Sequence, residues 1–426
     1  YGQRYDTSGN ALGGEFRINS TTNSTQYHQA VTALETGGFV VTWKNDSNAD
    51  IRAQRYDADG NALGDEFQIN TTSDHEQDYP TVAGLKDGGF VVTWESQYQD
   101  TAGSDYGIFA QRYDINGNTV GTETQINTHV ADNQQHSSVA SLTDGGFVVT
   151  WHSEGQDMVN GSAESGYYGV YAQRYDKDGS ADGSEFQVNT GVENHQQYPS
   201  VTGLADGGFV VTWQSYNQDA GSSDYGVYGQ RFDASGNAAG GEFQISTYTA
   251  NDQSQAEVTA LLDGGFVVTW TSYDQDAGND DNGIYGQRYN KDGTRFGDEF
   301  EINAYSASEQ QYPSVTALAD GGFMVAWESS GPDGSGYGIQ AQRFGVDGST
   351  NLFFTSAEAI NNTGTGQADA TVTVETLQDA VASLHQIDKV QLSGGVSADT
   401  DYSVSVWDGS DTHSVTYTAQ AGDTLS

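Results

Sequence analysis

The sequence contains no cysteine and few basic residues. Of its 426 residues, 15 are Lys or Arg and 59 are Asp or Glu, which gives a net charge of −44. The absence of cysteine excludes disulfides, thiolate metal sites and cysteine nucleophiles. The negative charge disfavours nucleic acid and anionic membranes as partners. No apolar run approaches the roughly 20 residues that span a bilayer, so we expect no membrane insertion.

What the sequence does contain is a repeat, with steps of 51 to 62 residues. Gln-Arg-aromatic occurs seven times, and Gly-Gly-Phe-(Val/Met)-Val-(Thr/Ala)-Trp occurs six times between those copies. Such a period indicates one supersecondary unit repeated along the chain. The first motif begins at Gln3, Gln54, Gln111, Gln173, Gln230, Gln287 and Gln342, and the second ends at Trp43, Trp94, Trp151, Trp213, Trp270 and Trp327.

One repeat reads as four short antiparallel strands. In residues 80–127, a short alternating run precedes a Gly-Gly turn and a β-branched and aromatic strand. A polar loop and two further strands follow, with no helical period. Repeated four-stranded sheets of this length are typical of an all-β fold, the β-propeller. A linear array of β-sandwiches is the alternative, but each sandwich needs about 100 residues.

The inventory of strands predicts the domain organisation. Seven third strands predict seven blades, with two strands of one blade lying upstream of Tyr1 or supplied from elsewhere; six blades and a spare hairpin are the alternative. We expect the propeller at residues 1–355, a linker at 356–366 and a small β-rich module at 367–426. Because Tyr1 opens in the middle of a repeat, the chain reads as a piece of a longer protein.

The repeated Arg residues have a candidate partner. In six repeats a Glu follows the Arg by eleven residues. If the hairpin folds about Gly60-Asn61, Arg55 and Glu66 become cross-strand partners, so the sequence predicts a repeated ion pair. The functional alternative is an Arg-lined central channel for an anion.

The loops between the second and third strands are the candidate ligand-binding segments. They are longer than a hairpin needs, acidic and rich in Tyr, and extra loop length is often functional. Asp residues, an amide and backbone carbonyls could hold Ca²⁺, whereas a Tyr beside Asp and Gln could stack on a sugar; a solvated loop is the third reading. The candidate ligand-binding residues are Tyr98, Tyr216, Tyr225 and Tyr273, and the candidate Ca²⁺ ligands are Asp100, Asp105, Asp157, Asp219, Asp224, Asp276 and Asp281.

Motifs of common enzyme classes are missing. The eight His residues form no His-Glu-x-x-His pair, and there is no Gly-x-Ser-x-Gly elbow and no phosphate loop. Propeller glycosidases use paired carboxylates, but no acidic residue stands out from its counterparts in the other repeats. We therefore expect a protein that is not an enzyme.

The Gly-Gly-Phe-Val-Val-Thr-Trp strand, the Gln-Asp-Ala-Gly loop and the Gly-(Ile/Val)-Tyr-(Ala/Gly)-Gln-Arg-Tyr-Asp strand resemble a repeat of very large secreted proteins of Gram-negative bacteria, the RTX-type adhesins and related hemolysin-type calcium-binding proteins. The resemblance covers about residues 1–350, and the tail is similar to small β modules of such proteins. It implies type I secretion, calcium and a role in adhesion. The Gly-Gly-x-Gly-x-Asp calcium repeat of that group is absent, so calcium binding depends on the loops alone.

Three functions remain open at this point. The first is a non-catalytic extracellular bacterial surface or adhesion module that binds glycan or cell-surface ligands, with Ca²⁺, through its loops. The second is a structural subunit of a surface filament or layer, whose partners are copies of itself. The third is a propeller-fold polysaccharide hydrolase.

Overall fold

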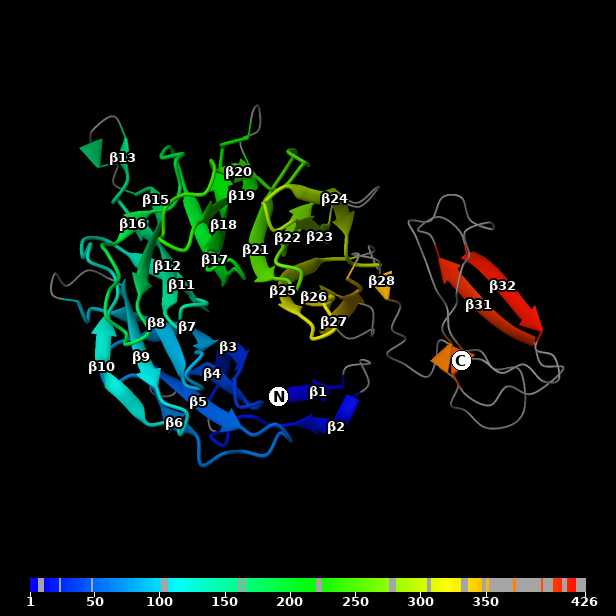
Figure 1. The fold of residues 1–426 in the computed structure, drawn as a ribbon, viewed down its shortest axis with the longest axis horizontal. Coiled ribbons are helices and arrows are strands. Elements are labelled where there is room, and N and C mark those ends of the chain that lie inside the picture. Colours follow the sequence, from blue (N-terminus) through cyan, green and yellow to red (C-terminus); the bar gives the residue numbers. More distant parts are fainter. Residues whose placement is uncertain are drawn as a thin grey trace. The chain divides into compact units, whose positions relative to one another are not determined.

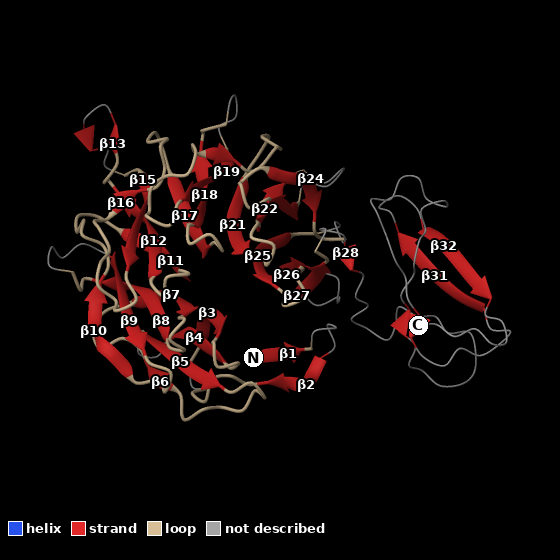
Figure 2. Cartoon of the chain, viewed as in Figure 1, coloured by secondary structure: helices blue, strands red, loops and turns tan. Residues whose placement is uncertain are grey.

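The structure is a computed structural model of the chain. It describes residues 1–6, 11–22, 24–46, 49–100, 106–159, 162–163, 166–219, 224–275, 281–304, 308–330, 336–346, 350–351, 371–372, 392–393, 401–407 and 412–418. Strands are the regular elements of these residues, which contain no helix and hence none that could cross a membrane (Figure 2). The chain divides into two compact units, Tyr1–Ala341 and Gln342–Ser426. The predicted boundary at residue 355 and the linker 356–366 lie outside the described residues.

The repeats fold into six four-stranded antiparallel sheets, the blades of a β-propeller, which confirms the predicted fold class. In five of the sheets the spatial order follows the chain order of the strands, and in the remaining one, β11-β12-β15-β16, the short β13–β14 pair intervenes in the chain. The strands of the blades are β3 (Gln26–Ala33), β4 (Phe39–Asn45), β5 (Asp50–Tyr56) and β6 (Phe67–Gln68); β7 (Gln77–Gly84), β8 (Phe90–Gln97), β9 (Tyr106–Tyr113) and β10 (Thr119–Gln125); β11 (Gln134–Ser141), β12 (Phe147–Glu154), β15 (Tyr168–Tyr175) and β16 (Phe186–Gln187); β17 (Gln196–Gly203), β18 (Phe209–Tyr216), β19 (Tyr225–Phe232) and β20 (Phe243–Gln244); β21 (Gln253–Ala260), β22 (Phe266–Tyr273), β23 (Asn282–Tyr289) and β24 (Arg295–Glu301); and β25 (Gln310–Ala317), β26 (Phe323–Ser330), β27 (Tyr337–Phe344) and β28 (Thr350–Asn351).

The count of seven blades is not confirmed, and the six-bladed alternative is what the described residues show. The first Gln-Arg-aromatic copy lies in β1 (Gly2–Tyr5), which pairs only with β2 (Ala11–Phe16) in a two-stranded sheet. Phe16 and Ile18 pack on the β3–β6 blade beside Trp43 and Tyr56. The remaining short strands are β13 (Met158–Val159), β14 (Ser162–Ala163), β29 (Thr371–Val372), β30 (Leu392–Ser393), β31 (Asp401–Trp407) and β32 (Thr412–Thr418).

The second unit contains two antiparallel pairs, β29 with β30 and β31 with β32. β31 and β32 lie within residues 367–426, where a small β-rich module is expected. The register of the second pair runs without a bulge from Asp401 opposite Thr418 to Trp407 opposite Thr412.

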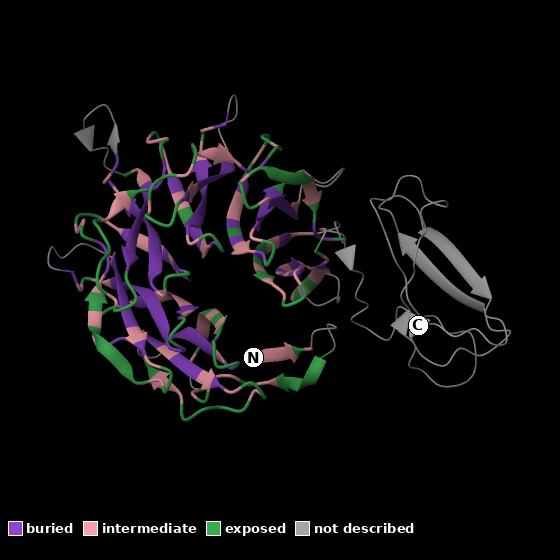
Figure 3. Ribbon diagram, in the orientation of Figure 1, coloured by how far each residue is buried: buried purple, intermediate pink, exposed green. Residues whose placement is uncertain are grey.

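The core of the propeller lies between blades rather than within them. Each apolar cluster joins residues of two neighbouring sheets, as where Ile108 of one blade packs with Trp151 of the next. The repeated Trp residues of β8, β12, β18 and β22 are fully buried. Buried positions accordingly fall in the second and third strands, and exposed ones in the outer strands (Figure 3). The sequence therefore builds the fold through contacts that need the neighbouring repeat.

The Gly-Gly turn is explained by two separate requirements. Gly88 has a φ of 86°, a conformation that L-residues rarely adopt. Gly89 has no such φ, but a Cβ built on it would lie 2.1 Å from the carbonyl oxygen of Tyr113. The first glycine is required by backbone conformation and the second by space.

The predicted Arg–Glu ion pair is wrong. The hairpin turn pairs Tyr113 with Thr119 and therefore Arg112 with Val120, not with Glu123; the bulge in the β9–β10 pairing comes after this pair. Arg112 instead donates to the carbonyl of Lys177 in the next blade at 2.9 Å, and it lies 3.4 Å from Asp87. This register differs from the one expected for a hairpin that folds about Gly60-Asn61. The sequence alone did not indicate the difference.

The Arg and the Glu of the expected ion pair each form hydrogen bonds with a neighbouring segment instead. The Arg of one blade reaches the hairpin turn of the next, as in the 2.8 Å bond from Arg231 to the Lys291 carbonyl. The Glu accepts bonds from the linker before its own blade, as Glu123 does from the N–H and hydroxyl of Thr71 at 2.6 and 2.9 Å. These contacts repeat around the propeller and join blade to blade.

The first strands of neighbouring blades contact one another and face the centre of the propeller, with the fourth strands outermost (Figure 1). First strands begin, second strands end and third strands begin at the same face, because successive strands are antiparallel. We call this the mouth face. It carries the loops between second and third strands, and the Gly-Gly turns lie at the opposite face.

Candidate functional site

The third residues of the six first strands lie together at the mouth face. All have a positive φ, between 45° and 57°, where the Cβ of an L-residue crowds a carbonyl oxygen. At each of them the pairing with the second strand is shifted by a β-bulge. Such strain is typical of functional sites. The six residues, the strained positions, are His28, Tyr79, His136, Tyr198, Gln255 and Tyr312.

The residue directly after each repeated Trp is polar in every blade. In five blades it is buried, with at most 6% of its surface exposed, and in the β25–β28 blade it is half-buried. A buried polar side chain is costly unless it is hydrogen-bonded, so this position calls for a reason. We call it the post-Trp position; its residues are Lys44, Glu95, His152, Gln214, Thr271 and Glu328.

In three blades the post-Trp side chain supports the strained position of the next blade. It accepts the backbone N–H of that residue, which would otherwise lack a partner in a crowded site. The pairs are Glu95 with His136 at 2.5 Å, His152 with Tyr198 at 3.2 Å and Gln214 with Gln255 at 3.2 Å.

Lys44 cannot accept a hydrogen bond, and the following blade compensates. Its Nζ donates to Asp78 at 2.7 Å and to Glu76 at 2.9 Å. Asp78 itself accepts the N–H of Tyr79 at 2.8 Å and lies 2.6 Å from Nδ1 of His28. Burial opposes ionisation of Asp78, but the hydrogen bonds from His28 and Lys44 outweigh it and hold the pKa of Asp78 below its ordinary value.

Asp78 and Glu95 form a pair of carboxylates with opposite tendencies. They are paired residues on β7 and β8, next to the bulge at Tyr79. Asp78 contacts His28 and Lys44 of the preceding blade, whereas Glu95 contacts His136 of the following blade. Burial raises the pKa of Glu95 to about 8, and the charge of Asp78 raises it further against the bond from His136. At neutral pH the pair therefore holds one ionised and one protonated carboxyl group.

Aromatic rings from four neighbouring first strands contact one another in series. Ring centroids lie 3.9 Å apart for His28 and Tyr79, 4.4 Å for Tyr79 and His136, and 4.5 Å for His136 and Tyr198. We call these four residues the aromatic belt. Burial lowers the pKa of His136 to about 4, so its imidazole is neutral at physiological pH.

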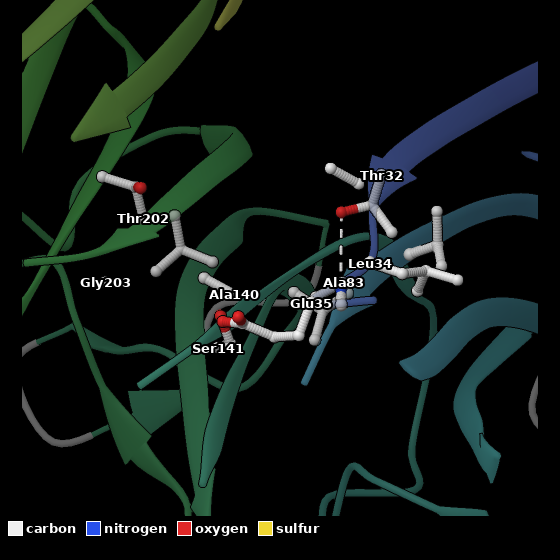
Figure 4. A pocket seen from close by; sticks show the side chains of 13 residues that line it. Thr32, Leu34, Glu35, Ala83, Ala140, Ser141, Thr202 and Gly203 are labelled. Atoms are coloured by element: carbon white, nitrogen blue, oxygen red, sulfur yellow. Dashed lines mark hydrogen bonds between the residues drawn. The ribbon is translucent and has the colours of Figure 1, made fainter. Parts of the chain in front are cut away.

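A cavity of about 520 Å³ lies at the other end of the first strands (Figure 4). It is lined by the ends of β3, β7, β11 and β17 and by Glu35. Thr32 accepts the N–H of Gly84 there at 3.3 Å. From the strained positions this end is five residues along the strands, or about 16 Å.

The four Tyr residues predicted to bind ligand all lie at the mouth face. Tyr98 and Tyr273 are exposed, by 47% and 40%. The rings of Tyr216 and Tyr225 are 5.1 Å apart, and the Tyr225 hydroxyl donates to Gln197, the neighbour of Tyr198, at 3.1 Å. The predicted face is thus that of the central cluster, although the cluster itself was not predicted.

Three of the predicted calcium ligands are buried. Asp100, Asp157 and Asp219 have at most 7% of their surface exposed. The hydroxyl of Tyr171 donates to Asp157 at 2.7 Å, and that of Tyr228 donates to Asp219. Burial raises the pKa values of Asp157 and Asp219. Since hydrogen-bond donors point at both carboxylates, a calcium ion would have to displace them.

The other four predicted calcium ligands give less evidence about an ion site. Asp224 and Asp281 accept backbone N–H groups through their own carbonyls, whereas Asp105 and Asp276 lie outside the described residues. Within the described part of the chain, no group of three or more His, Asp or Glu is placed to hold a metal ion. Calcium binding stays a prediction.

The sequence contains a signal for this site at the post-Trp position. Among near-identical copies of one strand, the residue after Trp is the one that changes from cation to carboxylate to imidazole. The statement that no acidic residue stands out from its counterparts is therefore wrong for Glu95. Comparing equivalent positions across the repeats, rather than seeking motifs, would have found it.

No protein-family model matches the chain, and no curated protein matches it. Solved structures do. A protein of unknown function from Dyadobacter fermentans is 12% identical, with a TM-score of 0.52 over 76% of this chain and 96% of that one. The GH93 α-L-arabinofuranosidase of Fusarium graminearum, solved with arabinobiose, is 13% identical, with a TM-score of 0.51 over 77% of this chain and 96% of that one. At these identities the likeness shows the propeller fold alone.

The expectation that the protein is not an enzyme is contradicted by this comparison, since the structures that match it include a glycoside hydrolase. The expectation rested on the absence of motifs and on the equivalence of the repeats. The polar residues at the centre are not equivalent, so the second ground also fails.

Proposed function

We propose that the protein is a carbohydrate-active propeller that binds a glycan at the mouth face and hydrolyses its glycosidic bonds. The observation that carries the proposal is the pairing of Asp78 with Glu95 on adjacent strands, in environments that lower the pKa of Asp78 and raise that of Glu95. Glycoside hydrolysis needs such a pair, because one carboxyl group must give a proton to the leaving oxygen while the other acts as nucleophile or base.

The environment of each carboxyl group indicates the catalytic role that we propose for it. Glu95, with a pKa of about 8, is the general acid. Asp78 is kept ionised by Lys44 and His28 and is the nucleophile or base. Glu95 is 1% exposed, so the proposed reaction requires a conformational change that brings its carboxyl group into contact with the glycosidic oxygen.

The comparison suggests the first substrates. The arabinofuranosidase of F. graminearum shares the fold and was solved with arabinobiose. Arabinan and arabino-oligosaccharides therefore head the panel, followed by xylan and β-glucan.

The test is turnover by the wild type, Asp78→Asn and Glu95→Gln, with release of sugars followed by chromatography. We expect each substitution to lower kcat by about 10²–10⁴-fold. Glu328→Gln is the matched control, because Glu328 holds the post-Trp position of another blade; it should retain activity. Absence of turnover on the whole panel by the folded protein, or unchanged turnover in both variants, would refute the proposal.

A second candidate is a non-catalytic glycan-binding module of a bacterial surface protein. The exposure of Tyr98 and Tyr273 on the mouth-face loops favours it. Binding without turnover, lost in Tyr98→Ala and Tyr273→Ala, would support this function. Secretion from a Gram-negative bacterium and calcium binding belong to this hypothesis, whereas self-assembly into a surface filament or layer is a separate one.

A further inference from the structure

Two tyrosines at the strained positions are exposed. Tyr198 and Tyr312 have 41% and 56% of their surface exposed. They lie on β17 and β25, on either side of the β21–β24 blade, which carries Gln255 at the same position. Exposed aromatic side chains on the innermost strands are unusual, because nothing in the packing between blades requires them there.

The backbone conformation at these two positions is one that tyrosine adopts at a cost, so the presence of tyrosine there calls for a reason. Their φ values are 53° and 56°, a region that Asn, Asp and Gly tolerate best. None of the six strained positions carries those residues. The strain is therefore associated with side chains that bear a ring or an amide, which is what a ligand at the mouth would contact.

Polar side chains of β21 bond to the strands that carry these two tyrosines. Gln255 Oε1 accepts the N–H of Tyr312 at 3.1 Å, which fixes that strand against its neighbour. Glu257 is exposed on the same strand as Gln255, and its Oε2 accepts the hydroxyl of Ser200 at 2.8 Å. Flat rings with amides and a carboxylate between them match a sugar, whose C–H face is apolar and whose rim carries hydroxyls.

We propose that Tyr198 and Tyr312 form a sugar-binding platform that holds an oligosaccharide beside the carboxylate pair. Tyr198 is the end of the aromatic belt, one ring beyond His136, and Glu95 holds the backbone of His136. The platform thus continues from the carboxylates around the mouth. A neutral oligosaccharide is the ligand, and longer chains reach more of the platform than a disaccharide does. This inference rests on the proposed function for its ligand class.

The repeat supplies the substitution for the test. Tyr198→Gln and Tyr312→Gln place on β17 and β25 the residue that β21 already carries at that position, so the backbone accepts it. Tyr198→Phe and Tyr312→Phe keep the ring and should retain binding. Tyr337→Gln is the matched control, since Tyr337 is 54% exposed at the same face but lies on a third strand, β27.

Binding is measured by calorimetry in the Glu95→Gln background, with arabino-, xylo- and gluco-oligosaccharides of two to six sugars. Each Tyr→Gln change on the platform should weaken binding of the longer chains about fivefold to tenfold, with less effect on disaccharides. Unchanged affinity in both platform variants overturns the proposal, as does an equal loss of affinity in Tyr337→Gln, or a Glu95→Gln protein that binds none of the probes.

The same variants separate this inference from the proposed function. If the wild type hydrolyses glycans and Tyr198→Gln and Tyr312→Gln leave KM unchanged, the platform fails and the hydrolase stands. If nothing is hydrolysed but binding depends on both tyrosines, the platform stands and the hydrolase fails. Thermal melts of every variant show whether a loss of affinity comes from unfolding, and the Phe variants then decide.

Discussion

Glu95 should make the stability of the protein depend on pH in a way that a single substitution removes. Its carboxyl group is 1% exposed, and burial raises its pKa from 4.5 to about 8. Because the folded-state pKa is above the unfolded one, stability is complete below pH 4.5 and is lost as the pH rises through 8. At about 1.36 kcal/mol per pKa unit, the folded state loses about 5 kcal/mol by pH 9.

Glu95→Gln keeps the shape and the carbonyl that accepts the His136 N–H, but it cannot ionise. Urea denaturation from pH 4 to 9 should give a free energy of unfolding that rises relative to the wild type by about 5 kcal/mol across that range. Ionisation of Asp78 affects both proteins alike and cancels. Glu328→Gln controls for the substitution itself. A constant difference between Glu95→Gln and wild type would show that Glu95 is already ionised at neutral pH, and its role as acid would lose its basis.

Three further outcomes are expected. Glycan hydrolysis should decline above about pH 8 as Glu95 loses its proton, and a pH–rate profile that stays flat to pH 10 would contradict this role. Arg231→Met removes a charge-assisted bond to the Lys291 carbonyl at 2.8 Å between blades, and chemical denaturation should show a loss of about 1.5–3 kcal/mol. Gly208→Ala would place a Cβ 2.2 Å from the carbonyl oxygen of Phe232, so the thermal midpoint should fall by several degrees; an unchanged midpoint would show that the turn can yield.

The propeller could be predicted because its signals are local. The Gly-Gly turn, the β-branched run and the 51 to 62 residue period each identify strands without knowledge of their neighbours. The blade count was less secure, because the first copy of the motif has the same sequence in a two-stranded sheet as in a full blade. Gln3-Arg4-Tyr5 carries no sign of which strands lie beside it.

The contacts between blades could not be predicted in the same way. Arg112 and Glu123 have opposite charges at a suitable spacing, yet the turn pairs Arg112 with Val120. Arg112 and Glu123 each bond to a residue more than fifty positions away. The site has the same character. The partners of Glu95 are a residue on β7 and the backbone of the next blade. Its role can therefore be recognised only when the three-dimensional arrangement of the repeats is known.

At the post-Trp position, the requirement of the fold can be distinguished from the requirement of the proposed reaction. The scaffold requires one acceptor for the N–H of the next blade, and carboxylate, imidazole and amide all meet that requirement. A cation is admitted only with a compensating Asp in the following strand, as Lys44 is with Asp78. The framework therefore accepts different side chains at the post-Trp position, and a reactive centre could be moved around the axis only by exchanging the post-Trp residue together with its partner in the following strand.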